Sequence, residues 1–423
     1  MKPIKNPVFI LLLLMMLLSS CQLKQTPVED TKNYTLATLH IAYYHIKGSD
    51  GHHDASLLSQ AVGLHPIESR IIKFREKYPN VKIYYTSMSG INRVQKKFES
   101  DSVLPDIIEI NPNHAKYLIR DRLVNQDVYY DDEMRMWEKY NRIIDATRID
   151  GEMLLMPVRS EPLIVLYNRT IFENLGVTPP SEDWTWDEFE NIASQLQQRG
   201  YTPIIQQNFN AIEPIIRAFG GNYVGKPGEV NGYLNSPATI AAFEKLFKLP
   251  LKFEPYIRKV ENSMYISIPS SLGISLEDDI KDYTAIPLPR ASDGSAYNTM
   301  FTTGLAISKS SEHADLAWEL IRTIIGDSDE EAIEFLAYNT LYSYSIKRPS
   351  ASEDIYEQLY KGHLSSEPST FYTNLYPYSW RSDADFVIGQ DALKELLDGA
   401  DVAATLGKYA QIIEEGIPQI FMK

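Results

Sequence analysis

Strand-like and helix-like segments alternate along the first part of the chain that can pack. β-Branched and aromatic residues at 37–44 predict a strand, apolar residues at helical spacing from Pro66 predict a helix, and residues 81–85 alternate with the period of two that indicates another strand. A short apolar strand is predicted at 105–110. Because strands that alternate with helices form a largely parallel sheet, the chain is predicted to be an α/β protein. Its ligands are then expected beyond the carboxyl ends of the strands.

The length of the chain predicts two lobes. Its 423 residues exceed the roughly 100–200 that one core uses. A strand-like run at 154–167 is interrupted by Arg159-Ser160-Glu161-Pro162, and we interpret this charged break as the place where the chain passes from one lobe to the other. Asp150-Gly151 within 149–153 is typical of a tight turn and predicts a hairpin there. Further on, Thr185 followed by Glu188 is typical of a capping box and predicts the start of a helix that runs to Gln198.

The N-terminus has the pattern of an exported lipoprotein. Lys2 and Lys5 precede an apolar run at 8–18, which is shorter than the roughly 20 residues that span a bilayer, so residues 1–20 are predicted to be a signal peptide. The end of this segment, Leu18-Ser19-Ser20-Cys21, resembles the bacterial lipobox, in which the cysteine is acylated and anchors the protein to a membrane. The alternative is an ordinary signal peptide whose cleavage site adjoins a cysteine. Residues 21–35 are predicted to be a polar tether.

Charge and cysteine content exclude several classes of function. The chain has 41 Lys and Arg against 56 Asp and Glu, a formal charge of −15, so a basic surface for nucleic acid is not expected. Cys21 is the single cysteine, which excludes an intramolecular disulfide and a zinc site built on cysteine. No cofactor is predicted.

A long central segment resembles a known family. The segment 157–196, PVRSEPLIVLYNRTIFENLGVTPPSEDWTWDEFENIASQL, is similar to the central part of the extracellular solute-binding proteins of carbohydrate-importing ABC transporters. Shorter matches occur in the family's order on both sides of it. They are FREKYPNV at 74–81, LPDII at 104–108, Phe219-Gly220-Gly221, the helix after Asn235-Ser236-Pro237, TAIPLPR at 284–290 and TTGLAISKSSEHADLAWELI at 302–321.

The resemblance implies two α/β lobes that are joined by crossing strands and close around a ligand cleft, as in periplasmic binding proteins. It implies an N-terminal lobe of residues 36–160 and about 302–342, and a C-terminal lobe of 161–301 and about 343–423. The implied function is to capture a sugar or oligosaccharide outside the cell and to deliver it to the permease subunits of an importer. A monomer, lipid-anchored to the cell membrane, is expected.

The resemblance also implies contacts with the ligand. Glu161 aligns with the inter-lobe position where maltose-binding proteins place a sugar-contacting glutamate, although a salt bridge with Arg159 or another basic group is the alternative. Asn111 and Asn113 match the region that contacts sugar hydroxyls, with an Asn where maltose-binding proteins have an Asp. The other candidates are Tyr43, Tyr44 and His45 at the end of the first strand, Asn208, Phe209 and Asn210 in the second lobe, and Tyr378 and Trp380 late in the chain.

At three places packing or solvent exposure competes with a functional role. Strand alternation lets at most one of Tyr43 and Tyr44 face a ligand, and core packing is the alternative for each. Trp184 and Trp186 are interpreted as residues that pack a helix start. The segment 46–65 is predicted to be a long solvated loop, and its Gly51-His52-His53-Asp54 is the alternative place for a divalent metal, although no metal site is predicted.

The motifs give little support to an enzyme. His65 and Glu68 form an H-x-x-E pair at a helix start, but no second histidine is placed to complete a zinc triad. Residues 220–226 approach a phosphate loop, but Pro227 replaces its Ser or Thr. Paired carboxylates are enough for glycoside hydrolysis, so a lipid-anchored carbohydrate-active enzyme is retained as the alternative function.

Overall fold

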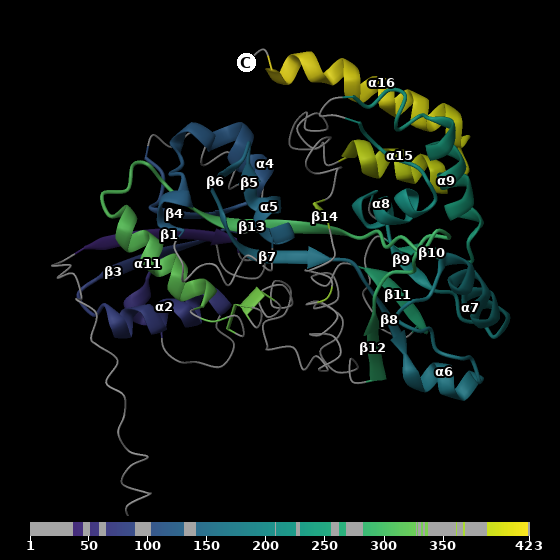
Figure 1. Cartoon of the computed structure of the whole chain (residues 1–423), viewed down its shortest axis with the longest axis horizontal. Coiled ribbons are helices and arrows are strands. Elements are labelled where there is room, and N and C mark those ends of the chain that lie inside the picture. Colours follow the sequence, from purple (N-terminus) through teal and green to yellow (C-terminus); the bar gives the residue numbers. More distant parts are fainter. Residues whose placement is uncertain are drawn as a thin grey trace, which may run out of the picture.

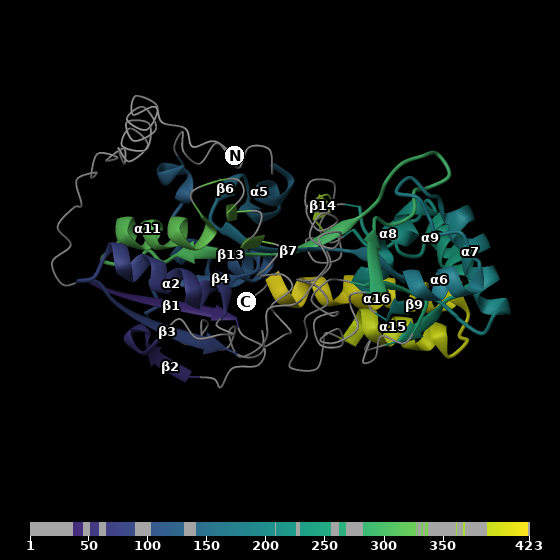
Figure 2. The same ribbon diagram turned by 90° about the horizontal axis from the view of Figure 1, so that it is seen from below.

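The computed structural model describes residues 37–44, 51–58, 65–88, 103–130, 141–207, 209–225, 229–254, 262–267, 282–326, 328, 331–332, 335–336, 361, 367–368 and 387–421. Two lobes lie side by side, each built around its own β-sheet, and two long strands run between them (Figure 1). The view from below shows the same two strands between the lobes (Figure 2). Within the described residues, no helix combines the length and the apolar character needed to cross a bilayer.

The first lobe contains a mixed sheet of seven strands. Its centre is parallel, as predicted, because β1 pairs with β3 on one side and with β4 on the other. The strands in order across the sheet are β14 (Glu367–Pro368), β13 (Thr299–Ile307), β4 (Ile107–Ile110), β1 (Thr38–Tyr44), β3 (Lys82–Met88) and β2 (Gly51–Asp54), and β7 (Met156–Pro162) also pairs with β13. The strand β13 runs antiparallel to β4, so the sheet is less parallel than the sequence pattern indicates.

The segment predicted to be a loop at 46–65 contains regular structure, so that part of the prediction is wrong. Residues Gly51–Asp54 form β2, and Ala55–Leu57 form a 3₁₀ turn. The strand forms because the free edge of β3 offers hydrogen-bonding partners, with His53 opposite Tyr85. Local composition does not reveal such an edge, because strand formation depends on the neighbouring strand.

Helices cover both faces of the first sheet. The helix α2 (Pro66–Lys77) begins at Pro66, as predicted, and buries Ile67, Ile71 and Phe74 together with apolar residues of α11 (Ala314–Ile325). The short helix α4 (Pro112–His114) and the turn that follows it lie against the opposite face. This lobe also contains α5 (Asn141–Thr147) and the hairpin of β5 (Arg148–Ile149) and β6 (Glu152–Met153).

The β5–β6 hairpin confirms the turn predicted at Asp150-Gly151. Asp150 and Gly151 connect the strands with φ angles of 52° and 88°. A two-residue turn with both φ angles positive suits the twist of antiparallel strands, and Asp-Gly tolerates this backbone better than most residue pairs.

The second lobe contains a five-stranded mixed sheet surrounded by helices. The strands in order are β10 (Lys252–Glu254), β9 (Ile204–Gln206), β11 (Met264–Ser267), β8 (Ile164–Asn168) and β12 (Tyr283–Ile286). The helices are α6 (Arg169–Leu175), α7 (Trp186–Gln198), α8 (Phe209–Ala218), α9 (Pro237–Lys248), α15 (Val387–Leu397) and α16 (Val402–Phe421). Residues of α15 and α16 join the core of this lobe, whereas β14, from the same C-terminal part of the chain, pairs with β13 in the first sheet.

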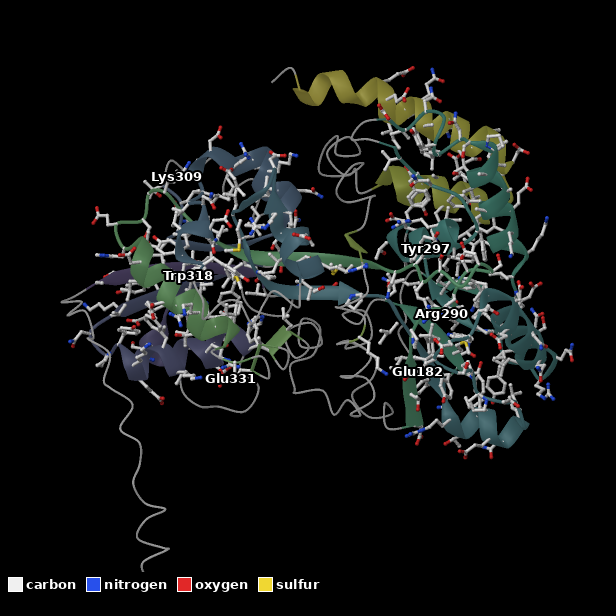
Figure 3. All side chains as sticks on the ribbon, in the orientation of Figure 1. Glu182, Arg290, Tyr297, Lys309, Trp318 and Glu331 are labelled. Atoms are coloured by element: carbon white, nitrogen blue, oxygen red, sulfur yellow. The ribbon has the colours of Figure 1, made fainter. Side chains whose placement is uncertain are left out.

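The start of α7 confirms two predictions. Glu188 Oε2 accepts a hydrogen bond from the Thr185 amide at 2.7 Å, and the Glu188 amide donates to Thr185 Oγ1 at 3.3 Å, which completes the capping box. Trp184 and Trp186 are buried in the core of the lobe, as expected of residues that pack a helix start. In Figure 3, Glu182, Arg290 and Tyr297 lie on this second lobe, and Lys309, Trp318 and Glu331 lie on the first.

Candidate functional site

The two lobes are joined where β7 and β13 run antiparallel. Pro162 lies opposite Met300, Glu161 opposite Phe301, and Arg159 opposite Thr303. After Pro162 the chain continues through Leu163 into β8 of the second sheet. The predicted lobe boundaries, at 160/161 and 301/302, therefore fall inside these two strands.

A reciprocal contact fixes the second-lobe end of this crossing. Asn298 Oδ1 accepts a hydrogen bond from the Leu163 amide at 3.2 Å, and Asn298 Nδ2 donates to the Leu163 carbonyl at 2.9 Å. The side-chain amide of Asn298 thus takes the place of a backbone N–H and C=O that would pair with Leu163 in an antiparallel sheet. The chain segments that continue β7 and β13 are therefore hydrogen-bonded to each other where they enter the second lobe.

A buried ion pair fixes the first-lobe end. Arg159 Nη2 lies 2.6 Å from Glu109 Oε1, and the two side chains are 7% and 1% exposed. The same oxygen accepts a hydrogen bond from Thr303 Oγ1 at 2.9 Å. Glu109 belongs to β4, so one carboxylate on a central strand of the first sheet holds both crossing strands. The sequence marks Arg159 as part of a charged break, but its partner in the structure is Glu109, 50 residues away.

Glu161 shares a face of β7 with Arg159, because side chains two residues apart point to the same side of a strand. Its side chain lies at the crossing and is 8% exposed. The position fits the inter-lobe location that the resemblance implies, although contact with a ligand stays a prediction.

A second polar cluster lies at the carboxyl end of β1. The Tyr43 hydroxyl donates a hydrogen bond to the Glu68 carboxylate, and the Tyr43 ring packs against His65 with ring centroids 4.9 Å apart. Burial, followed by the charge of Glu68, raises the pKa of Tyr43 well above its ordinary value, so the phenol stays protonated and can donate. The same two causes raise the pKa of Tyr85.

The H-x-x-E pair forms a helix cap. The Glu68 Oε2 atom accepts from the His65 amide at 3.1 Å, and His65 Nδ1 accepts from the Ile67 amide at 3.2 Å. His65 therefore serves as the N-cap of α2. Across the described residues, no group of three or more His, Cys, Asp and Glu is arranged to hold a metal ion.

The carboxyl end of β4 leads directly into a second capped turn. Asn111 Oδ1 accepts from the His114 amide at 2.8 Å, and Asn111 Nδ2 lies 3.0 Å from His114 Nδ1. Burial lowers the pKa of His114 to about 4, so this ring is neutral near pH 7. Asn113, between them, is buried as well.

The family follows from a comparison over most of the chain. Residues 65–331 match the profile of the family described as bacterial extracellular solute-binding protein. The chain belongs to this family. A protein of Pyrococcus horikoshii described as an uncharacterized ABC transporter extracellular-binding protein is 26% identical to this solute-binding protein over 200 residues, which cover 44% of each chain. The match thus spans less than half the length of this curated relative.

Solved structures share the fold of this solute-binding protein. The sugar-binding protein MalE of Xanthomonas citri matches with a TM-score of 0.66 and 13% identity over 90% of this chain and 98% of that one. An ABC substrate-binding protein of Listeria monocytogenes, in complex with cycloalternan, matches with a TM-score of 0.63 and 14% identity over 90% of this chain and 99% of that one. The maltose-bound MalE3 of T. maritima matches with a TM-score of 0.62 and 16% identity over 90% of this chain and 99% of that one. These similarities confirm the predicted two-lobe α/β fold.

The structure places only some of the predicted contact residues of this solute-binding protein. Tyr43 is fully buried in the core of the first lobe, which corresponds to the packing alternative. Phe209 begins α8 and packs in the core of the second lobe, where the centroids of its ring and the Tyr223 ring are 4.5 Å apart. Tyr44 ends β1 and Asn210 lies in α8. The side chains of Tyr44 and Asn210, and all of Cys21, His45, Asn208, Tyr378 and Trp380, lie outside the described residues.

Sequence reasoning missed Glu109 and Glu68 as members of polar clusters. Glu109 sits in the predicted apolar strand at 105–110, where a carboxylate costs free energy unless a partner compensates its charge. That mismatch is the signal that points to a buried partner. The sequence shows Glu68 only as half of an H-x-x-E pair, which does not reveal its contact with Tyr43.

Proposed function

We propose that this solute-binding protein captures a sugar or oligosaccharide outside the cell and delivers it to an ABC importer when its two lobes close. The main support is the crossing: two lobes with separate cores are joined by β7 and β13, and Glu161 lies on the joining strand. A carboxylate at that point can accept paired hydrogen bonds from vicinal hydroxyls. The cycloalternan and maltose named for two structural relatives are ligands of this kind.

The relatives also favour a second ligand class. A structure of UgpB from Mycobacterium tuberculosis with glycerophosphocholine matches this chain with a TM-score of 0.63 and 16% identity over 84% of this chain and 95% of that one. The glycerol moiety of glycerophosphocholine also has vicinal hydroxyls, so this compound belongs in the same ligand screen. A carbohydrate-active enzyme is the remaining alternative, and it predicts release of reducing ends over hours.

A thermal-shift screen tests the proposal. The panel contains neutral mono- and oligosaccharides, uronic acids and glycerophosphocholine. A ligand at about 100 times its Kd adds about 2.7 kcal/mol to the free energy of unfolding, so above its Kd a true ligand raises the melting temperature with the logarithm of its concentration. A panel without any concentration-dependent shift contradicts the proposal, and turnover of the ligand supports the enzyme instead.

Glu161→Ala is expected to weaken sugar binding by more than about 1 kcal/mol, which is more than about fivefold in Kd, because hydroxyl donors lose a charged acceptor. Isothermal titration calorimetry measures the change. Glu182→Ala is the matched control, since that carboxylate is exposed on the second lobe and pairs with Lys361 at 2.9 Å (Figure 3). Equal affinity of the Glu161→Ala variant and the control would remove Glu161 from the binding site.

Lipid anchoring is part of the proposal. Acylation of the Cys21 sulfur, together with cleavage that removes residues 1–20 and makes Cys21 the N-terminus, would hold the protein at the membrane through the tether at 21–35, close to the permease subunits that receive the ligand. A monomer that presents one lobe to each permease half fits this role. Cys21→Ser is expected to move the protein from the membrane fraction to the soluble fraction of the producing cells, which fractionation and immunoblotting can measure. An unchanged distribution would contradict the anchor.

A further inference from the structure

Two fixed points bracket a short stretch of the crossing strands. At the first-lobe end, Glu109 Oε1 binds Arg159 of β7 and Thr303 of β13. At the other end, the Asn298 side chain binds both backbone groups of Leu163. The stretch between these points is residues 160–162 of β7 and 299–302 of β13.

Two threonine side chains inside this stretch form no hydrogen bond to either lobe within the described residues. The hydroxyls of Thr299 and Thr302 are buried, and neither has a hydrogen-bond partner among the described residues. Ser160 Oγ lies 3.1 Å from Met300 Sδ, so that contact joins one crossing strand to the other. The contrast is sharp at adjacent residues, because Thr303 is bound to Glu109 and Thr302 is not.

The backbone also changes character at the first-lobe end. The register between β7 and β13 shifts between Thr303 and Gly304, directly beside the contact with Glu109. A Cβ atom on Gly304 would lie 2.8 Å from the Met156 carbonyl oxygen, so the strands approach there too closely for a side chain. Beyond the bulge, β13 is paired with β4 on its other side, from Gly304 to Ile307. The bulge therefore separates the part of β13 that pairs with β4 from the part that continues to the second lobe, where Thr299 and Met300 pair with the two-residue strand β14.

We propose that Glu109 is a positioning residue for lobe closure, which holds Arg159 and Thr303 so that the crossing strands bend beyond them and not in the part of the first sheet where β13 pairs with β4. This inference rests on the proposed function, in which the lobes move. The same strand β4 continues into Asn111 and Asn113, so Glu109 also links the bending point to the predicted ligand-facing end of the first lobe. A carboxylate suits this task because a hydrogen bond to a charged acceptor is about twice as strong as a neutral one.

Neighbouring threonines on β13 provide a matched test. Thr303→Val removes the hydroxyl that donates to Glu109 and keeps the shape of the side chain and the ion pair. Thr302→Val makes the same change one residue away, at a hydroxyl without a hydrogen-bond partner in the described part of the chain. Thr303→Ser restores the donor. Hydrogen–deuterium exchange is measured on the full chain without ligand, in peptides that cover 156–163 and 299–304.

Thr303→Val is expected to speed amide exchange in these two peptides about tenfold, with the melting temperature lowered by no more than a few degrees and the exchange of β8, β11 and β12 unchanged. Thr302→Val and Thr303→Ser are expected to match the wild type. Equal exchange in Thr303→Val and Thr302→Val would overturn the inference, and so would faster exchange spread over the whole first lobe. Should Thr303→Val not fold, Thr303→Ala is compared with Thr302→Ala under the same criteria.

The readout separates this inference from the proposed function. Exchange in the ligand-free chain reports on the crossing strands whether or not a sugar binds. A wild-type chain that binds no sugar contradicts the proposed function, whereas a Thr303→Val variant with wild-type exchange contradicts only the role of Glu109. X-ray scattering of the same free samples adds a check, because a bending point displaced into the first sheet is expected to broaden the distribution of inter-lobe distances in Thr303→Val alone.

Discussion

Replacing Arg159 with methionine is expected to lower the free energy of unfolding by about 3–5 kcal/mol, because the variant leaves the Glu109 carboxylate buried without its cation. Glu109 is 1% exposed, so water cannot replace the lost partner without opening the crossing. Methionine fills much of the volume of the arginine stem, so the loss is mainly electrostatic. Denaturant unfolding followed by circular dichroism measures the change.

The double variant R159M/E109L is the control for this prediction. It removes both charges, and buried ion pairs replaced by apolar side chains of similar size often lose little stability. We expect it to recover most of the loss, except for about 1 kcal/mol from the acceptor that Thr303 no longer has. Equal losses in the single and double variants would show that the stability comes from packing and not from charge compensation.

Trp184→Ala is expected to cost a similar amount, about 3–5 kcal/mol, in the second lobe. The side chain is 1% exposed, its Nε1 donates to the Pro287 carbonyl at 2.9 Å, and its ring centroid lies 5.8 Å from that of Phe189. The variant loses buried apolar area, leaves a cavity and removes a hydrogen bond that ties the start of α7 to the segment after β12. Scanning calorimetry measures the loss as a lower unfolding temperature of this lobe.

Trp184→Phe provides the comparison, since it keeps an aromatic ring in the core and should lose clearly less stability than Trp184→Ala. Ligand affinity, measured below the unfolding temperature of the variants, is expected to stay within about twofold of the wild type, because a residue that packs a helix start contributes through stability. A variant with wild-type stability and a much weaker affinity would instead place Trp184 in the binding site.

Local signals predicted the elements that depend on near neighbours. Pro66 marks the start of α2, Asp150-Gly151 makes the β5–β6 turn, and Thr185 with Glu188 caps α7, because each interaction closes within a few residues. The division into two lobes was predicted from the length of the chain and the charged break at 159–162, whereas the crossing strands and the ligand cleft were implied only by the resemblance.

Pairing over long distances was not predictable in the same way. The strand β2 forms on the edge of β3, about 30 residues later in the chain, and Glu109 meets Arg159 across 50 residues. Neither contact leaves a local pattern, although a glutamate in an apolar strand indicates that some partner exists. Among the predicted contact residues, Glu161 lies at the crossing and its contact with a ligand stays a prediction, whereas Tyr43 and Phe209 belong to cores.

In the proposed function a ligand closes the two lobes around the β7–β13 crossing. Small-angle X-ray scattering of the protein, with and without a ligand from the thermal-shift screen, tests this closure most directly. At saturating ligand we expect a smaller radius of gyration at unchanged molecular mass, and a return to the free value when the ligand is removed. Superimposable scattering curves for the free and the saturated protein would contradict lobe closure.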